Sequence, residues 1–143
     1  MAITTAMCNS FKQELLGGVH DLDTDTLKIA LIKPSSTGTL GEGTANYSDL
    51  GSDEATGTNY SAGGQTLDSA SITLSGSTVF VDFADEVFTN LTISAAGAII
   101  YNSSQSNKAI AVFNFGTTVT STAGDFTVVF PTANASSAVI RIT

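Results

Sequence analysis

The apolar positions near the start of the chain recur with the spacing of a helix. Met7, Phe11 and Leu15 follow one another at intervals of four residues, and Cys8 joins Phe11 and Leu15 on the same stripe. This pattern predicts an amphipathic helix over residues 4–16. A short helix with one apolar stripe must bury that stripe against another element, and the rest of the chain offers a sheet.

The residues at both ends of this segment favour its termination there. Thr4 or Thr5 can serve as the N-cap, because a hydroxyl side chain accepts a hydrogen bond from the first free backbone N–H groups. Gly17 and Gly18 follow the last apolar position, and glycine readily adopts the left-handed conformation that ends many helices.

From Asp25 onward the period changes, and apolar residues alternate with polar ones or form short runs bounded by turn residues. Seven or eight strands are predicted. They fall within the segments 26–34 (ending at Pro34), 65–76, 77–88, 91–104, 108–116, 126–131 and 137–143. Within this set, residues 97–101 and 110–113 flank the polar stretch "NSSQSNK" and predict a hairpin.

Short, closely spaced strands without intervening helices are typical of antiparallel sandwiches and jelly rolls. We therefore expect a mainly β fold, an antiparallel β-sandwich or jelly-roll-like domain with one short N-terminal α-helix. No internal repeat is evident, so we expect a single domain over residues 1–143. The one shift in composition, at residues 35–57, predicts a long polar loop with little core content.

The stretch "TNYSAGGQTL" at residues 58–67 raises the question of a ligand loop. Phosphate-binding loops show GxGxxG, or end in Gly-Lys-Ser/Thr, whereas Gly63 and Gly64 are adjacent and no lysine follows them. We interpret the stretch as a turn in which the glycines supply positive φ angles and Tyr60 packs back onto the sandwich. No cofactor-binding residue is predicted.

Charge is sparse and mostly negative. Charged residues make up 13% of the chain, about half of the roughly 25% usual for soluble domains, while Ser and Thr account for 38 of the 143 residues. From Val87 to the end only Lys108, Asp125 and Arg141 are charged. Such a surface is either hydrated through its hydroxyls or covered by another chain, since interface cores are depleted in Lys, Glu and Asp.

The net charge of −8, with four Lys and one Arg, argues against a nucleic-acid partner. The start of the chain lacks a basic and apolar signal pattern, and no run of 18 apolar residues occurs, so we expect neither a secretory signal nor a membrane partner. Cys8 is the one cysteine, which fits synthesis in a reducing cytoplasm. Five Asn-x-Ser/Thr sequons are interpreted as a result of composition.

Asp21, Asp23 and Asp25 have the one-three-five spacing of a calcium loop. An EF-hand also needs Gly at position six and Glu at position twelve, which here hold Thr26 and Ile32. We interpret the three aspartates as a solvated turn between helix and strand.

A second acidic group, Asp82, Asp85 and Glu86, can hold an ion or form a charged bend between strands, and we favour the bend. His20 is the one histidine, so a zinc site would depend on Cys8 and carboxylates. No metal ligand is therefore predicted.

The residue inventory permits a Ser-His-Asp triad, but there is no GxSxG motif and His20 falls in the connection after the helix, where we expect a loop or core-edge residue. A glycosidase cleft would need aromatic walls, and the chain has no Trp and three Tyr, at 47, 60 and 101. Cys8 is interpreted as a core residue. We expect no catalytic residue and no enzymatic activity.

Phenylalanines at strand spacing are interpreted as core or interface residues. They are Phe80, Phe83, Phe88, Phe113, Phe115, Phe126 and Phe130.

Several stretches together resemble small virion structural proteins of tailed bacteriophages, over nearly the whole chain. They are "AMCNSFKQELLGGVH" (6–20), "TLKIALIKPS" (26–35), "TGTNYSAGGQTL" (56–67), "GAIIYNSS" (97–104) and "STAGDFTVVFPT" (121–132). The most specific parts are the turn at 60–67 and the hairpin around "NSSQSNK". The loop at 35–55 is the weakest part.

The resemblance implies a role in the particle, with some such proteins acting as cement or decoration on the capsid exterior. It leads us to expect a non-enzymatic decoration protein, made in the host cytoplasm, that binds the major capsid protein and itself as a symmetric oligomer, a homotrimer. Two alternatives stay open. One is a tail tube, connector or fibre component, and the other is a carbohydrate-binding module for host attachment that stacks sugars on Tyr47, Tyr60 or Tyr101.

Overall fold

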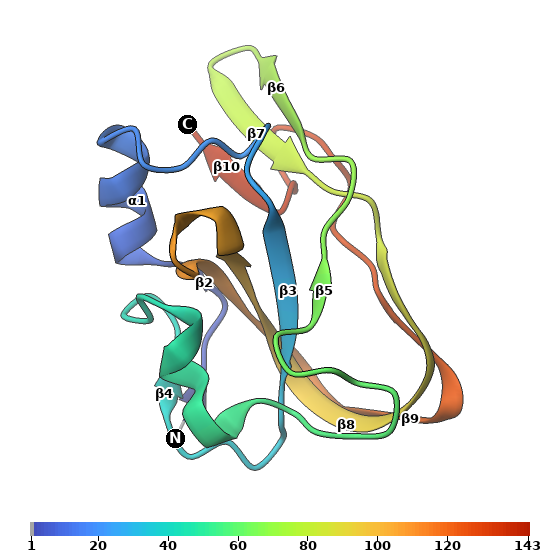
Figure 1. Ribbon diagram of the computed structural model, residues 1–143. Helices are drawn as coiled ribbons and strands as arrows, with labels where there is room; N and C mark the ends of the chain where they lie inside the picture. Colours follow the sequence, from blue (N-terminus) through green and yellow to red (C-terminus); the bar gives the residue numbers. More distant parts are fainter. Residues whose placement is uncertain (1) are drawn as a thin grey trace.

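The computed structural model describes residues 2–143 and is mainly β, with antiparallel sheets and one short α-helix (Figure 1). In chain order the elements are β1 (Ala2–Ile3), β2 (Ala6–Met7), α1 (Asn9–Leu16), β3 (Leu27–Ile32), β4 (Thr39–Leu40), η1 (Tyr47–Asp53), β5 (Gln65–Thr66), β6 (Ser71–Ser75), β7 (Thr78–Asp82), β8 (Glu86–Asn102), η2 (Ser103–Gln105), β9 (Lys108–Val128) and β10 (Ile140–Ile142). The predicted fold class is confirmed. One pair departs from it, because β1 and β4 run parallel over two residues.

The main sheet has the strand order β2-β9-β8-β3-β5 and is built on one long hairpin. β8 and β9 run antiparallel and curve together (Figure 1), with register shifts at several points that let long strands bend. Asn102 pairs with Lys108 at the tip, which confirms the hairpin predicted around "NSSQSNK". Near this tip β8 is buried on both faces, so it reads as a continuous apolar run rather than an alternation.

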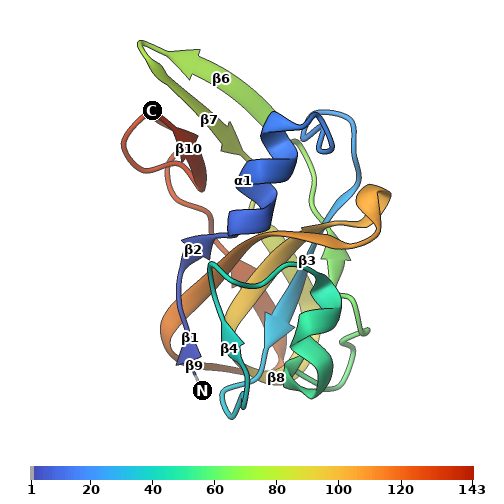
Figure 2. The same ribbon diagram turned by 90° about the vertical axis from the view of Figure 1, so that its left-hand side faces the viewer.

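The second sheet has the order β10-β7-β6. Strands β6 and β7 form a hairpin that pairs from Ser71 with Asp82 to Ser75 with Thr78 across a two-residue turn. α1 lies beside this sheet, as Figure 2 shows, and it also contacts β9 of the main sheet. Core residues come from both sheets and from Phe11 of the helix.

The predicted helix boundary was wrong at its N-terminal end. Ala6 and Met7 pair with β9 as strand β2, so the helix begins at Asn9, with Cys8 rather than Thr4 or Thr5 at the N-cap. The Cys8 side chain makes no capping hydrogen bond. Cross-strand bonds to β9 outcompete the helical pattern for these residues, and the sequence alone does not show that partner. Gly18 (φ +75°) supplies the expected left-handed stop.

The segment at 35–57 is not a loop without core content, as its composition predicted. It contains β4 and η1, and it contributes Leu40, Leu50 and Ala55 to the core. Backbone bonds from Lys33 N to Asp53 O and from Ala55 N to Leu31 O tie it to β3. The three apolar residues follow neither a helical nor a strand period, so periodicity could not identify them.

Candidate functional site

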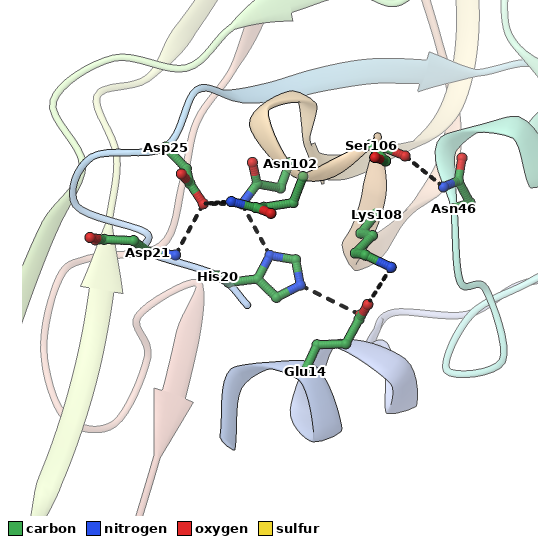
Figure 3. A network of polar contacts seen from close by, with 9 residues as sticks. Glu14, His20, Asp21, Asp25, Asn46, Asn102, Ser106 and Lys108 are labelled. Carbon is green, nitrogen blue, oxygen red and sulfur yellow. Dashed lines mark hydrogen bonds and ion pairs between the residues drawn. The ribbon is translucent and has the colours of Figure 1, made fainter. Parts of the chain in front are cut away.

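A polar network at the tip of the β8–β9 hairpin connects three parts of the chain (Figure 3). The Asn102 amide nitrogen Nδ2 donates to His20 Nδ1 at 3.0 Å and to Asp25 Oδ2 at 2.7 Å. Because Nδ2 can only donate, Nδ1 of His20 accepts and the ring proton lies on Nε2, which faces Glu14 Oε1 at 3.5 Å. Glu14 Oε2 in turn accepts from Lys108 Nζ at 2.9 Å.

This network occupies both ring nitrogens of His20, whose side chain is fully buried and packs on Phe11 at 5.0 Å between ring centroids. No serine hydroxyl is bonded to His20 anywhere in residues 2–143. The interpretation of His20 as a core-edge residue is confirmed. The network joins α1, the turn before β3 and the hairpin tip.

Asp21, Asp23 and Asp25 form the predicted turn between helix and strand. Asp21 Oδ1 accepts from the backbone N–H groups of Asp23 and Thr24, and Asp25 Oδ2 accepts from the N–H of Asp21. The bonds from Asn102 and then from Asp21 hold the pKa of Asp25 below its usual value. No cluster of metal-ligating side chains occurs among the described residues.

The second acidic group lies at the bend between β7 and β8, as expected. Asp85 Oδ1 accepts from the N–H of Phe130, and Glu86 accepts from Gln65 Nε2. Burial raises the pKa of Glu86. These contacts tie the bend to the C-terminal part of the chain and to β5.

Tyr47 and Tyr60 both hydrogen-bond the Glu54 carboxylate, and Tyr101 bonds the adjoining turn. Glu54 Oε2 accepts from Tyr47 Oη at 2.5 Å, and Oε1 accepts from Tyr60 Oη at 2.9 Å and from Gly63 N at 2.7 Å. Tyr101 Oη donates to the carbonyl of Gly63 at 2.6 Å. Tyr47 and Tyr101 also stack, with ring centroids 4.6 Å apart.

Burial raises the pKa of all three phenols, to about 12 for Tyr101, and the Glu54 charge adds to the effect. Tyr101 is 2% exposed, and Tyr47 and Tyr60 are half-buried. Their hydroxyls serve the fold. This placement weakens the sugar-stacking hypothesis, which needs an aromatic face open to solvent.

The turn at residues 58–67 has the predicted conformation. Gly63 and Gly64 have φ angles of +93° and +73°, and a Cβ on Gly64 would lie 1.7 Å from the carbonyl oxygen of Ile29. Tyr60 stacks on Phe88 at 5.9 Å and accepts a bond from Leu31 N. The glycines therefore allow close backbone packing on β3.

Cys8 is fully buried, and burial raises the pKa of its thiol to about 12. Its interpretation as a core residue is confirmed. Among the sequon asparagines, Asn46, Asn59 and Asn102 use their side-chain nitrogens in hydrogen bonds within the fold.

The main feature that sequence reasoning missed is an apolar patch on the β10-β7-β6 sheet and the adjoining end of α1. Cross-strand pairing aligns Ile72 with Val81 and Ile140, and Leu74 with Val79 and Ile142, so one face of the sheet is wholly apolar. In the first row Val81 and Ile140 are buried and Ile72 is exposed, whereas all three residues of the second row are exposed. The open part, called the apolar patch below, consists of Leu15, Leu16, Ile72, Leu74, Val79 and Ile142.

Two hollows lie between the α1 side chains and the strand side chains of this patch. One of about 340 Å³ lies between α1 and Ile142, and one of about 370 Å³ lies between Leu15 and the strands. Leu16 is 92% exposed and Leu74 is 69% exposed. Lys12 and Arg141 line the first hollow, and no acidic group does. The signal was present in the alternation of "SITLS" and "TVFVD", but only the fold shows that the face stays uncovered.

No protein-family model, curated protein or solved structure matches this chain. Within residues 2–143, no helix has both the length and the apolar character needed to cross a membrane.

Proposed function

We propose that this chain is a non-enzymatic structural protein of a tailed-bacteriophage particle. In this proposal it is a cement, or decoration, protein that binds the outside of the major capsid lattice as a symmetric oligomer and stabilises it. The resemblance of the sequence to small virion proteins suggests the particle. The surface of the molecule supports the role.

The apolar patch carries this proposal. Five large apolar side chains in it are more than a third exposed, and they adjoin one another over α1 and one sheet face. They are Leu16, Ile72, Leu74, Val79 and Ile142. Contiguous apolar surface on a soluble chain marks an interaction site, because water contact with it is unfavourable.

The polar interior supports the same role. The side chains that the sequence offered as candidate chemistry, namely His20, Asp25 and the tyrosines, hydrogen-bond to other groups of the fold and hold loops in place. These bonds fix the loops against the sheets, and a fixed surface suits a protein whose role is to bind a partner.

Cementing follows from mass action. A protein that binds only the assembled lattice stabilises it by RT ln(1 + [L]/Kd) per site, about 2.7 kcal/mol at a hundredfold excess over Kd. Because a shell has many equivalent sites, a modest energy per copy resists rupture.

The test is cryo-electron microscopy of the intact particle that contains this chain. Density that matches the β8–β9 hairpin and α1, arranged on the shell exterior at local symmetry axes, is the expected result. A second measurement compares shells with and without the purified chain, and the bound shells should rupture at a higher temperature.

Density confined to the tail or its tip would overturn the capsid proposal in favour of a tail component. Binding to a glycan array that is lost on Tyr47→Ala would favour host attachment.

A further inference from the structure

Strand β6 is an unguarded sheet edge. It is the terminal strand of the order β10-β7-β6, and all five of its residues, Ser71–Ser75, are exposed. Natural edge strands are usually protected by Lys, Pro, bulges or a covering segment. The stretch "SITLS" contains no charge and no proline, and its pairing with β7 runs without a register shift.

The hairpin geometry shows which backbone groups are free. Ser75 and Thr78 flank the two-residue turn and therefore form a hydrogen-bonded pair. Because bonded and non-bonded pairs alternate, the N–H and C=O groups of Ile72 and Leu74 point away from β7 toward the open edge. Their side chains lie on the apolar face of the sheet.

We propose that two copies of this chain associate through β6, pairing antiparallel about a two-fold axis at Thr73. The two three-stranded sheets then form one six-stranded sheet. In this register Ile72 of one copy pairs with Leu74 of the other, and the reverse, so both outward residues bond. If the register shifted by two residues in either direction, only one of Ile72 and Leu74 would still lie opposite an outward-pointing residue of the other β6 strand.

The same register makes the apolar faces continuous. Ile72 and Leu74 are 49% and 69% exposed in one copy, and each lies directly opposite the other residue type across the axis. The pairing therefore removes apolar surface from water in both copies, in addition to satisfying the backbone groups.

Electrostatics favour this contact over other contacts between two copies of a chain with net charge −8. Residues 69–81 contain no charged side chain, while Asp68 and Asp82 stand at the base of the hairpin. In an antiparallel pair the two bases lie at opposite ends. The bases of the two hairpins are about four residues apart, or roughly 14 Å along the strands. This distance exceeds the Debye length of about 8 Å at physiological salt, so salt screens the repulsion between them.

The other edge of the sheet is less suited to pairing. β10 has three residues, and Arg141 lies between the two residues that pair with Val79 and Val81. A head-to-tail ring of three copies would need this edge to match β6, whereas the two-fold contact needs β6 alone. The contact is thus self-complementary.

The inference rests on the proposed function only for the claim that the particle uses this dimer, since the contact itself forms in solution. Sedimentation equilibrium of the full chain should give twice the chain mass of 14.6 kDa at high concentration. Leu74→Lys should raise the dissociation constant at least about tenfold, equivalent to about 1.4 kcal/mol. Leu16→Lys, which makes the same change on α1, should leave it unchanged.

A second readout fixes the register. Thr73→Cys should form an interchain disulfide readily, because directly opposite residues in a non-bonded pair have Cα atoms about 4.5 Å apart, within disulfide range. Thr127→Cys, at an exposed position on β9, is the matched control and should crosslink only by slow collision. Cys8 is fully buried and does not compete.

A dimer that loses affinity in Leu74→Lys but not in Leu16→Lys, with selective crosslinking at residue 73, supports the inference. A monomer at high concentration, a trimer, or equal crosslinking at 73 and 127 overturns it. A β6 dimer from a chain that is absent from the shell would refute the proposed function alone. Density on the shell for a chain that is monomeric in solution would refute only the dimer.

Discussion

Asn102 Nδ2 lies 3.0 Å from His20 Nδ1, although the two residues are 82 positions apart in the sequence. Asn102 is fully buried, and its second amide hydrogen bonds Asp25 at 2.7 Å. One side chain therefore closes the helix-to-strand turn over the tip of the β8–β9 hairpin.

Replacing Asn102 with Ala should destabilise the fold by about 3 kcal/mol, because it leaves the buried His20 Nδ1 without its donor and removes the shortest hydrogen bond to Asp25. Urea unfolding followed by circular dichroism measures the loss. Gln105→Ala is the matched control: it removes a longer bond, 3.4 Å, to the same Asp25 oxygen, and should cost less than about 1 kcal/mol. Equal losses of unfolding free energy in the two variants would show that the bonds of Asn102 stabilise the fold no more than the bond of Gln105.

The Asp53 carboxylate should make the stability of the fold depend on pH in the acid range. Bonds from the N–H groups of Thr37 and Gly38 hold its pKa below the ordinary value of 3.8. The stabilisation is therefore fully present above pH 3.8 and is lost as the pH falls below it, through the lowered pKa of the folded state. Asp53→Asn should flatten this dependence in denaturation curves taken across that range.

Asp23→Asn serves as the control for the acid experiment, since the Asp23 carboxylate accepts no hydrogen bond from any of residues 2–143. Its curve should match that of the unmodified protein. A curve for Asp53→Asn with the same acid slope as the unmodified protein would contradict the assignment.

The tyrosine cluster should resist alkali. Burial raises the pKa of Tyr101 to about 12 from an ordinary value of 10, and it raises those of Tyr47 and Tyr60 as well. Since the raised pKa values favour the neutral phenols of the folded state, stability is present below pH 10 and is lost as the pH rises toward 12. The chain has no Trp and no other Tyr, so tyrosinate absorbance near 295 nm reports on this cluster alone.

Native protein should show little tyrosinate at pH 10, whereas protein in denaturant should be about half ionised there. A native titration midpoint near 10 would mean that the three hydroxyls are open to solvent.

Gly64 should tolerate no side chain. A Cβ there would lie 1.7 Å from the Ile29 carbonyl oxygen, so Gly64→Ala must displace the turn from β3 and should cost more than about 3 kcal/mol. Gly18→Ala has nearly the same positive φ but nothing within 4 Å, and should cost about 1 kcal/mol from backbone strain alone. Thermal unfolding compares the two, and similar melting temperatures would argue against the close approach.

The sequence by itself determined the elements whose signals are local. Alternation predicted β3 and the β6–β7 pair, turn residues predicted the hairpin tip at 102–108, and the adjacent glycines predicted the turn after Tyr60. These features depend on side-chain period and on φ preference, which the residues themselves carry.

The tertiary structure determined the conformation of segments whose local signals compete or show no period. Ala6 and Met7 fit a helix but pair with β9, and Leu50 enters the core from a polar stretch that folds as η1. The sequence showed that Ile72 and Leu74 share a face with each other. Only the packing of α1 and the strand order decided that this face and its edge remain open, because burial is a property of what lies opposite and not of the residues alone.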